Sequence, residues 1–220
     1  SWWYLVIVWK YLKNQIIIGY PSIGSLSKNP GELEINTSLT GSRIGFKDLL
    51  LFAPDLDNTK FFKSNPNAVM TISGKITGKL NDFKIENLES NGVSNTKIAG
   101  SGRIKGLPDS RKAFFDLNIK NLETTAADIN QFLPTGTIPN TIQLPSPINA
   151  TGIFKGTITD FFTNLALTSN YGDAKIKVNF NNAISNNEQY NAVASLDYFT
   201  LGKLIRHSSI GTVSLNSTVN

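Results

Sequence analysis

The sequence contains no cysteine, one histidine and one methionine among its 220 residues. Without cysteine there are no disulfide bonds and no thiolate metal sites. The one histidine, His207, excludes a histidine pair for zinc, and any Ser-His-Asp arrangement would depend on it alone. His207 lies in the polar stretch from Arg206 to Ser209, where we expect a solvated loop side chain. The sequence also lacks an Asp-x-Asp-x-Asp loop for calcium. We therefore expect no catalytic residues, no metal and no cofactor.

Charge and long apolar runs are also scarce. Charged residues make up 17% of the chain, below the roughly 25% of an average globular protein. The net charge is +5, but the lysines are scattered singly and form no basic run, so we expect no nucleic-acid partner. The apolar run from Trp2 to Trp9 has eight residues, fewer than the roughly 20 that a membrane-spanning helix needs.

The first 29 residues stand apart from the rest and are left unassigned. One alternative for Ser1–Tyr20 is a truncated membrane anchor, since Lys10 and Lys13 follow the apolar run; the others are a buried strand or sequence foreign to the domain. We favour the second group. Since the chain lacks an initiator methionine and stops within a strand pattern, we expect a fragment of a longer protein.

The most informative feature present is an internal repeat. Gly74 and Gly78 recur as Gly152 and Gly156, each offset by 78 residues, and the Asp-Phe pair that follows recurs at the same offset. A recurring β unit predicts a repeat array, in which each unit buries its apolar face by stacking on its neighbours.

Within each copy, apolar and polar residues alternate. This period of two predicts strands with one buried face, at 70–80 and again at 148–158. Return strands are expected at 83–90 and 161–169, third strands at 98–104 and 176–180, and fourth strands at 113–122 and 190–199. Short polar turns between them predict an antiparallel meander of about ten strands. We expect an all-β protein whose long, twisted, open sheet curls into a groove.

Three short breaks interrupt the strand pattern at 45–54, 125–134 and 200–205. In the first two, apolar residues spaced i, i+3 (Leu49 with Phe52, Ile129 with Phe132) predict short helices that cap an open end of the sheet. Asp48 and Asp128 are expected to stabilise the helix starts. The resulting organisation is a first β unit at 30–134, a Pro-rich connection at 135–147 and a second β unit at 148–220.

Glycines recur on the apolar side of the expected strands. One interpretation is steric relief beside a bulky neighbour; the other, which we favour, is sharp curvature of the sheet into a trough. The segment Gly100–Gly106 resembles a dinucleotide-binding glycine motif only loosely, because its last spacing is one residue too long and it falls within a strand.

Several segments, taken in order, resemble the TamB translocation and assembly module proteins of Bacteroidota, in the AsmA-like superfamily. The resemblance covers about residues 31–220. The segments that carry it are 117–129 with Phe132-Leu133-Pro134, 136–139, 152–156, 172–175 and 201–204.

The resemblance implies an interior segment of a periplasmic protein that is anchored in the inner membrane and reaches toward the outer membrane. It implies the open sheet called a β-taco, with phospholipid acyl chains and an outer-membrane assembly protein of the TamA/BamA type as partners. The alternative is a structural or chaperoning module whose sheet edge pairs with client strands; an enzyme is a distant third.

The lipid-groove candidates are Met70, Ile72, Ile76, Leu80, Ile98, Ile104, Leu117, Ile119, Ile148, Phe154, Ile158, Ile176, Val178 and Phe180.

Overall fold

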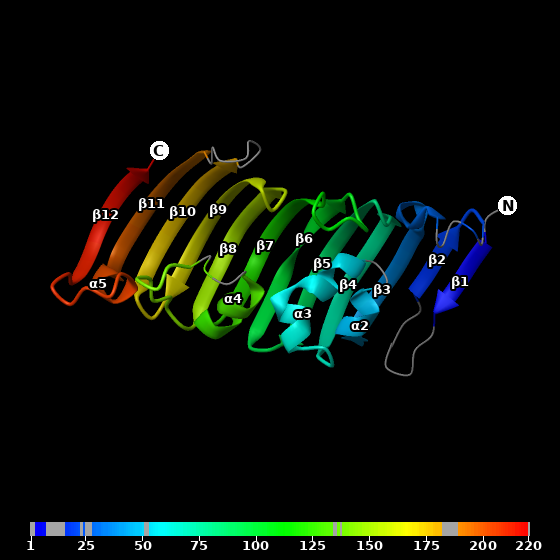
Figure 1. The fold of residues 1–220 in the computed structure, drawn as a ribbon, viewed down its shortest axis with the longest axis horizontal. Helices are drawn as coiled ribbons and strands as arrows, with labels where there is room; N and C mark the ends of the chain where they lie inside the picture. Colours follow the sequence, from blue (N-terminus) through cyan, green and yellow to red (C-terminus); the bar gives the residue numbers. More distant parts are fainter. Residues whose placement is uncertain are drawn as a thin grey trace.

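In a computed structural model, the described residues of the chain form twelve strands in one antiparallel sheet, and their order in the sheet is their order in the sequence (Figure 1). The sheet is an open meander, since the first and last strands do not pair with each other. The structure describes residues 3–7, 16–22, 24, 28–50, 53–133, 136, 138–181 and 189–219. The predicted all-β fold, a long curled open sheet with short helices at its breaks, is confirmed.

The strands are β1 (Trp3–Ile7), β2 (Ile16–Tyr20), β3 (Glu34–Gly45), β4 (Val69–Lys79), β5 (Asp82–Val93), β6 (Thr96–Lys105), β7 (Phe114–Thr124), β8 (Ile148–Gly156), β9 (Asp160–Ser169), β10 (Gly172–Asn181), β11 (Gln189–Thr200) and β12 (Thr212–Val219). The helices are the 3₁₀ turns η1 (Pro30–Glu32) and η2 (Pro54–Asn58) and the α-helices α2 (Phe46–Leu49), α3 (Lys60–Ser64), α4 (Ala126–Phe132) and α5 (Leu201–Leu204).

A helix follows every fourth strand: α2 follows β3, α4 follows β7 and α5 follows β11. Because neighbouring strands run in opposite directions, strands four apart end at the same side of the sheet. We call this side the helical rim; the other, the turn rim, carries short turns such as those between β4 and β5 and between β8 and β9. Figure 1 shows α2, α3 and α4 gathered in front of the strands near the helical rim.

The strands bend in the middle because β-bulges follow one another across the sheet. Register shifts occur between Leu39 and Ser42, Ser73 and Lys75, Ile85 and Leu88, Ala99 and Gly100, and Ile119 and Leu122. Each bulge adds a residue to one strand and kinks it. A line of kinks through β3–β8 therefore folds the sheet along its long axis.

The repeated glycines have matching backbone conformations in the two units. Gly74 has a φ of 143° and Gly152 one of 141°, values that side chains rarely adopt. A Cβ on Gly152 would also collide with the carbonyl oxygen of Asn164 in β9. Both features fit curvature rather than relief beside a bulky side chain, because the crowding atoms belong to the neighbouring backbone.

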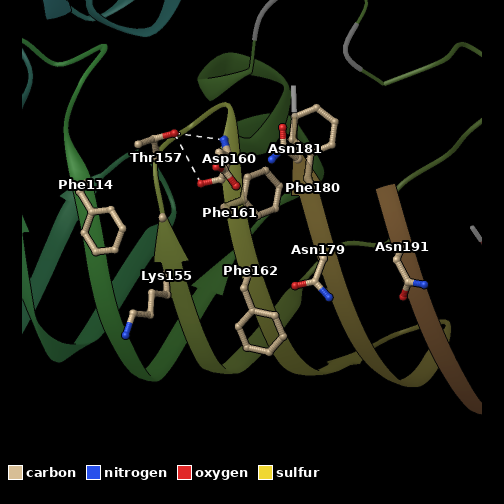
Figure 2. A pocket seen from close by; sticks show the side chains of 11 residues that line it. Phe114, Lys155, Thr157, Asp160, Phe161, Phe162, Asn179, Phe180, Asn181 and Asn191 are labelled. Atoms are coloured by element: carbon tan, nitrogen blue, oxygen red, sulfur yellow. Dashed lines mark hydrogen bonds between the residues drawn. The ribbon is translucent and has the colours of Figure 1, made fainter. Parts of the chain in front are cut away.

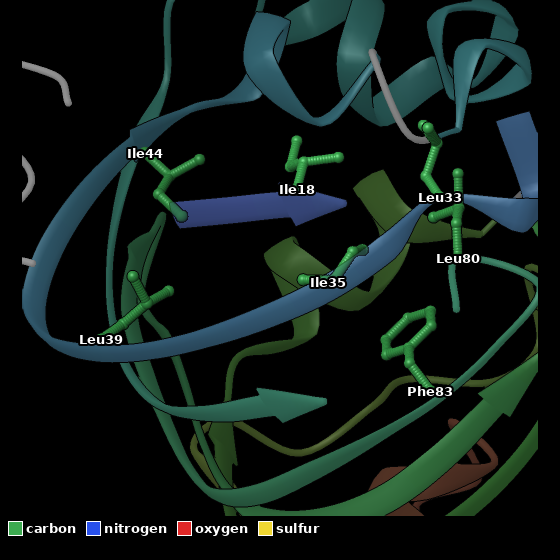
Figure 3. Packing of buried hydrophobic residues seen from close by; sticks show 7 residues of the cluster. All are labelled: Ile18, Leu33, Ile35, Leu39, Ile44, Leu80 and Phe83. Atoms are coloured by element: carbon green, nitrogen blue, oxygen red, sulfur yellow. The ribbon is translucent and has the colours of Figure 1, made fainter. Parts of the chain in front are cut away.

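The N-terminal segment that the sequence left unassigned joins the same sheet. β2 pairs with β3, with Ile18 opposite Ile35, and β1 pairs with β2. Ile18 is buried in a core cluster with Leu33, Leu39 and Phe83, and Figure 3 shows the curved strand β3 passing around these side chains. Lys10 and Lys13 lie outside the described residues, as do Phe52 and Pro134 of the predicted breaks.

The Pro-rich connection runs beside the helical rim. The Gln143 amide donates to the carbonyl oxygen of Leu204 at 2.7 Å, and the Ser146 amide donates to the Asn170 side chain at 3.1 Å. These bonds tie the connection to the end of α5 and to the turn between β9 and β10. A second, smaller core cluster of Tyr171, Ala174 and Phe199 lies beside them.

Candidate functional site

Residues paired across antiparallel strands point to the same side of the sheet, so the pairing shows which side chains share a face. One face is mainly apolar and the other is mainly polar. The inner face, on the inside of the curl, carries the register line Ile76, Ile85, Gly102, Leu117 and Phe154. The line continues through Thr163 and Val178 to Ala192. The neighbouring line, two residues along each strand in β4–β6, is Gly78, Phe83 and Ile104. Apolar residues and glycine thus dominate this face in both units.

Most inner-face side chains outside the buried core clusters are half-buried, and some of them pack against those clusters (Met70, Ile72, Ile76 and Ile104 against the first, Ile176 against the second). Eleven of the fourteen predicted groove residues belong to this class: Met70, Ile72, Ile76, Ile98, Ile104, Leu117, Ile119, Phe154, Ile176, Val178 and Phe180. Folding normally removes such side chains from water, since burial yields about 25 cal/mol per Å². We call these eleven residues the half-buried strip. They form an apolar surface that the fold covers only in part.

Four phenylalanine rings form a row on the inner face near the turn rim. Phe115, Phe154, Phe161 and Phe180 come from the consecutive strands β7, β8, β9 and β10. Their successive ring centroids lie 6.4, 5.2 and 5.4 Å apart. Offset and edge-on contacts at such distances stabilise by about 0.5–1.5 kcal/mol per pair beyond area burial. The row makes this stretch of the inner face a continuous aromatic surface.

The outer face is polar and carries ion pairs between neighbouring strands. Lys97 lies 3.1 Å from Glu123, and Arg103 donates two hydrogen bonds to the carboxylate of Asp82. The hydrogen bond from Arg103 holds the pKa of Asp82 below its ordinary value. At the turn rim, the hydrogen bond and charge of Lys79 lower the pKa of Glu32 in the same way. These exposed pairs contribute little stability each, but they make the outer face readily solvated.

At the helical rim, α2, η2, α3 and α4 form what we call the helical cap, over the inner face. Phe61 of α3 contacts Phe46 of α2 at 5.2 Å between ring centroids and stacks on Phe132 of α4 at 4.1 Å. Lys60 and Asn65 of this segment also donate hydrogen bonds to the backbone of Asn130 and the side chain of Gln131. Segments far apart in sequence are thereby joined into one layer.

The two repeated aspartates at the helix starts have different partners. Asp48 accepts a hydrogen bond from the backbone amide of Gly45 at 2.9 Å, as expected for a residue that caps a helix start. Asp128 is 1% exposed and lies in the first turn of α4. Its carboxylate instead accepts bonds from the Asn95 amide and the Thr96 hydroxyl, both at 3.0 Å. Asp128 thus fastens the cap to the turn between β5 and β6.

A cavity of about 670 Å³ lies at the turn rim beside β8, β9 and β10 (Figure 2), and Phe161 and Phe180 of the phenylalanine row also line it. Its lining mixes aromatic rings such as Phe114 and Phe162 with Lys155, Asn179 and Asn191. The Thr157 hydroxyl accepts from the Asp160 amide at 3.0 Å, which fixes the turn beside it. This mixed lining differs from the apolar character of the inner face.

No protein-family model, curated protein or solved structure matches this chain.

Three of the fourteen predicted groove residues depart from the half-buried strip. Leu80 is 1% exposed and lies in the turn after β4, where it packs in the core cluster of Leu33 and Phe83. Ile148, at the start of β8, is buried on the inner face. Ile158 is 60% exposed and lies in the turn after β8. The predicted strand at 148–158 is two residues too long, because β8 ends at Gly156.

The inner face also includes apolar residues other than the fourteen predicted ones. In β5 these include Ile85 and Leu88, and in β9 Phe161, Leu165 and Leu167. In β9 the alternation is imperfect, since Phe162 and Ala166 are apolar on the other face and Thr163 interrupts the inner-face line from Phe161 to Leu167. In β5 the bulge between Ile85 and Leu88 breaks the period of two, so that alternation alone fails there.

The described residues include no group arranged for metal binding. Across the described part of the chain there is no cluster of three or more His, Cys, Asp or Glu residues that could hold a metal ion. His207 is exposed in the turn after α5, and Gly100–Lys105 lies inside β6 rather than at a helix start. Among the residues that the structure describes, no helix is long and apolar enough to cross a membrane.

Proposed function

We propose that this chain is a segment of a bridge-like periplasmic protein whose inner face carries phospholipid acyl chains between the inner and outer membranes. In this proposal the parent protein is anchored in the inner membrane, as the resemblance to the TamB family implies. The observation that carries the proposal is the strip of half-exposed apolar side chains along the inner face of both units.

An open groove suits transport better than a closed cavity does. Burying an acyl chain yields about 0.8 kcal/mol per methylene, so a fully enclosed tail of ~15 methylenes would gain roughly 12 kcal/mol and hardly leave. A partly covering groove gains less at each position. Near-equivalent positions, such as those offered by β6 in the first unit and β10 in the second, let a chain move sideways without a large barrier.

The faces of β8 supply a matched pair of variants for the test. Phe154 is half-buried on the inner face, whereas its neighbour Ile153 is 41% exposed on the outer face. We expect Phe154→Asp to abolish phospholipid co-purification and crosslinking, and Ile153→Asp to leave both intact. Native mass spectrometry of the purified proteins measures the bound lipid, and circular dichroism confirms that each variant folds.

Phe154 belongs to the phenylalanine row, so its substitution could also disturb packing. A second inner-face variant is therefore needed. Val178→Asp changes a half-buried inner-face residue of β10 outside that row. If both variants fold normally and still bind and transfer lipid as the unmodified chain does, the inner face is not a conduit.

The second candidate function is assembly of outer-membrane proteins, in which a sheet edge pairs with a client strand or an assembly partner of the TamA/BamA type. This function would use the backbone groups of an edge strand of the parent protein rather than inner-face side chains, because edge strands are templates for strand addition. Crosslinks that follow the β12 backbone instead of the inner face would support this function over lipid transport.

A further inference from the structure

An apolar pocket lies between the helical cap and the inner face. The pocket measures about 500 Å³ and lies between the cap side chains Phe46, Phe61 and Phe132 and the strand side chains Met70, Ile98 and Leu122. Its volume falls within the range of about 300–1,000 Å³ that small-molecule sites occupy. Over this part of the inner face the cap forms a partial roof, and the pocket stays open to solvent.

The pocket offers almost no polar group to a ligand. Its polar side chains are the hydroxyls of Thr59, Ser90 and Thr96, and no charged side chain lines it. The Thr59 hydroxyl already donates to the Leu56 carbonyl at 2.7 Å. The Thr96 hydroxyl is bonded to Thr124 and Asp128. A charged or amide-bearing ligand would lose its hydration here without compensation, whereas a hydrocarbon chain would lose nothing.

The pocket is continuous with the half-buried strip. Met70 and Ile98 belong to both, since each is half-buried on the inner face and also lines the pocket. A chain that lies along the inner face therefore reaches the pocket without crossing a polar barrier. The roof is held by the stack of Phe61 on Phe132 and by the bonds of Asp128 to the β5–β6 turn.

We infer that this pocket binds the methyl end of one acyl chain, so that the chain is held by its tail while its polar end stays outside. The inference rests on the proposed function, because it assumes that acyl chains occupy the inner face. It adds a place where a chain pauses: the partly roofed pocket covers more of the chain than the open groove does, and affinity rises with each covered methylene.

The test compares two photoactivatable phospholipids bound to the purified chain. One carries a diazirine at the last carbons of an acyl chain, and the other carries it beside the ester. Mass spectrometry of the crosslinked peptides should find the tail-end probe on residues 46–62 and 122–132, and the ester-side probe outside the cap. Equal labelling of the cap by the two probes overturns the inference.

Ser90 allows a matched pair of variants, since it is 8% exposed, lies on the inner face opposite Ile98 and lines the pocket. Ser90→Leu fills the pocket with apolar volume, whereas Ser90→Ala removes only the hydroxyl. We expect Ser90→Leu to reduce tail-end labelling of the cap about tenfold, the equivalent of about two displaced methylenes, and Ser90→Ala to leave it unchanged. Undiminished labelling in a folded Ser90→Leu variant also overturns the inference.

The outcomes separate the two proposals. Labelling along β8–β10 without labelling of the cap leaves lipid transport standing and removes the pocket. Absence of labelling on the whole inner face removes both. A free fatty acid with the same terminal diazirine, used as a third probe, shows whether the pocket needs a phospholipid or only its chain.

Discussion

The carboxylate of Asp128 accepts a hydrogen bond from the hydroxyl of Thr96 at 3.0 Å, and the same oxygen accepts one from the amide of Asn95. The contact joins the first turn of α4 to the turn between β5 and β6, two segments at the helical rim. Because Asp128 is 1% exposed, its loss would leave the part-buried amide of Asn95 without this acceptor and the hydroxyl of Thr96 with only the Thr124 hydroxyl.

We expect Asp128→Ala to lower the free energy of unfolding by about 2–4 kcal/mol, since unsatisfied buried donors cost about 1–3 kcal/mol each. Urea denaturation measures the change, and hydrogen exchange should show faster opening of α4 and of the Asn95 amide. Asp128→Asn keeps one carbonyl oxygen and should lose less than half as much. A loss below about 0.5 kcal/mol in the alanine variant, the size of an ordinary surface substitution, would contradict this role.

Gly152→Ala tests the curvature of the second unit. A Cβ at this position would collide with the Asn164 carbonyl oxygen, and the φ of 141° is unfavourable for alanine. We expect a loss of about 2–4 kcal/mol from crowding and backbone strain combined. Gly211→Ala is the control, because nothing lies within 4 Å of its Cβ position, and it should change stability by less than about 0.5 kcal/mol. Equal effects of the two substitutions would argue against the close approach of β8 and β9.

Ser42 offers a stabilising substitution. Its side chain is 0% exposed on the inner side of β3, and among the described residues its Oγ is a buried oxygen without a hydrogen-bond partner. Ser42→Ala removes this group and should raise the free energy of unfolding by about 1 kcal/mol. Ser38→Ala, at an exposed position on the other face of the same strand, should leave it within about 0.5 kcal/mol. Destabilisation by Ser42→Ala would point to a partner for this hydroxyl.

The pair of Asp82 and Arg103 predicts a pH effect. The hydrogen bond from Arg103 lowers the pKa of Asp82, so that the folded state favours the ionised carboxylate. The resulting stabilisation is present above the pKa of the unfolded chain, about 3.9, and is lost as the pH falls through the lower pKa of the folded state.

Arg103→Gln should therefore raise the pKa of Asp82 toward its ordinary value, as followed by NMR titration of the carboxyl carbon. Lys105→Gln should raise it less, since Lys105 acts only through its charge. High salt should shrink both differences, because exposed charges are screened. An unchanged pKa of Asp82 in Arg103→Gln would show that the two groups do not pair in solution.

The repeat and its glycines could be predicted from the sequence because they depend on local geometry. Gly74 and Gly152 share both their position in the unit and their backbone conformation. The inner-face assignment of Ile76, Phe154 and Val178 followed from alternation, which holds wherever a strand runs without a bulge.

What could not be predicted depends on contacts between distant segments. Pro54 was expected to end the first break, but it begins η2, and proline is well suited to a first helical position. Helix α3 follows, with Thr59 accepting from the Phe62 amide at its start. The ring of Phe61 in α3 stacks on that of Phe132, about 70 residues away in the sequence. No local sequence pattern predicts such a contact.

The spacing of the helices has a consequence for length. Because a helix closes every fourth strand, and strands lie about 4.8 Å apart, each unit advances the sheet by about 19 Å and restores the same strand direction. Units of this kind can be added in whole numbers without turning either face over or moving the helices to the other rim. The number of units in a chain would then set the distance that it spans.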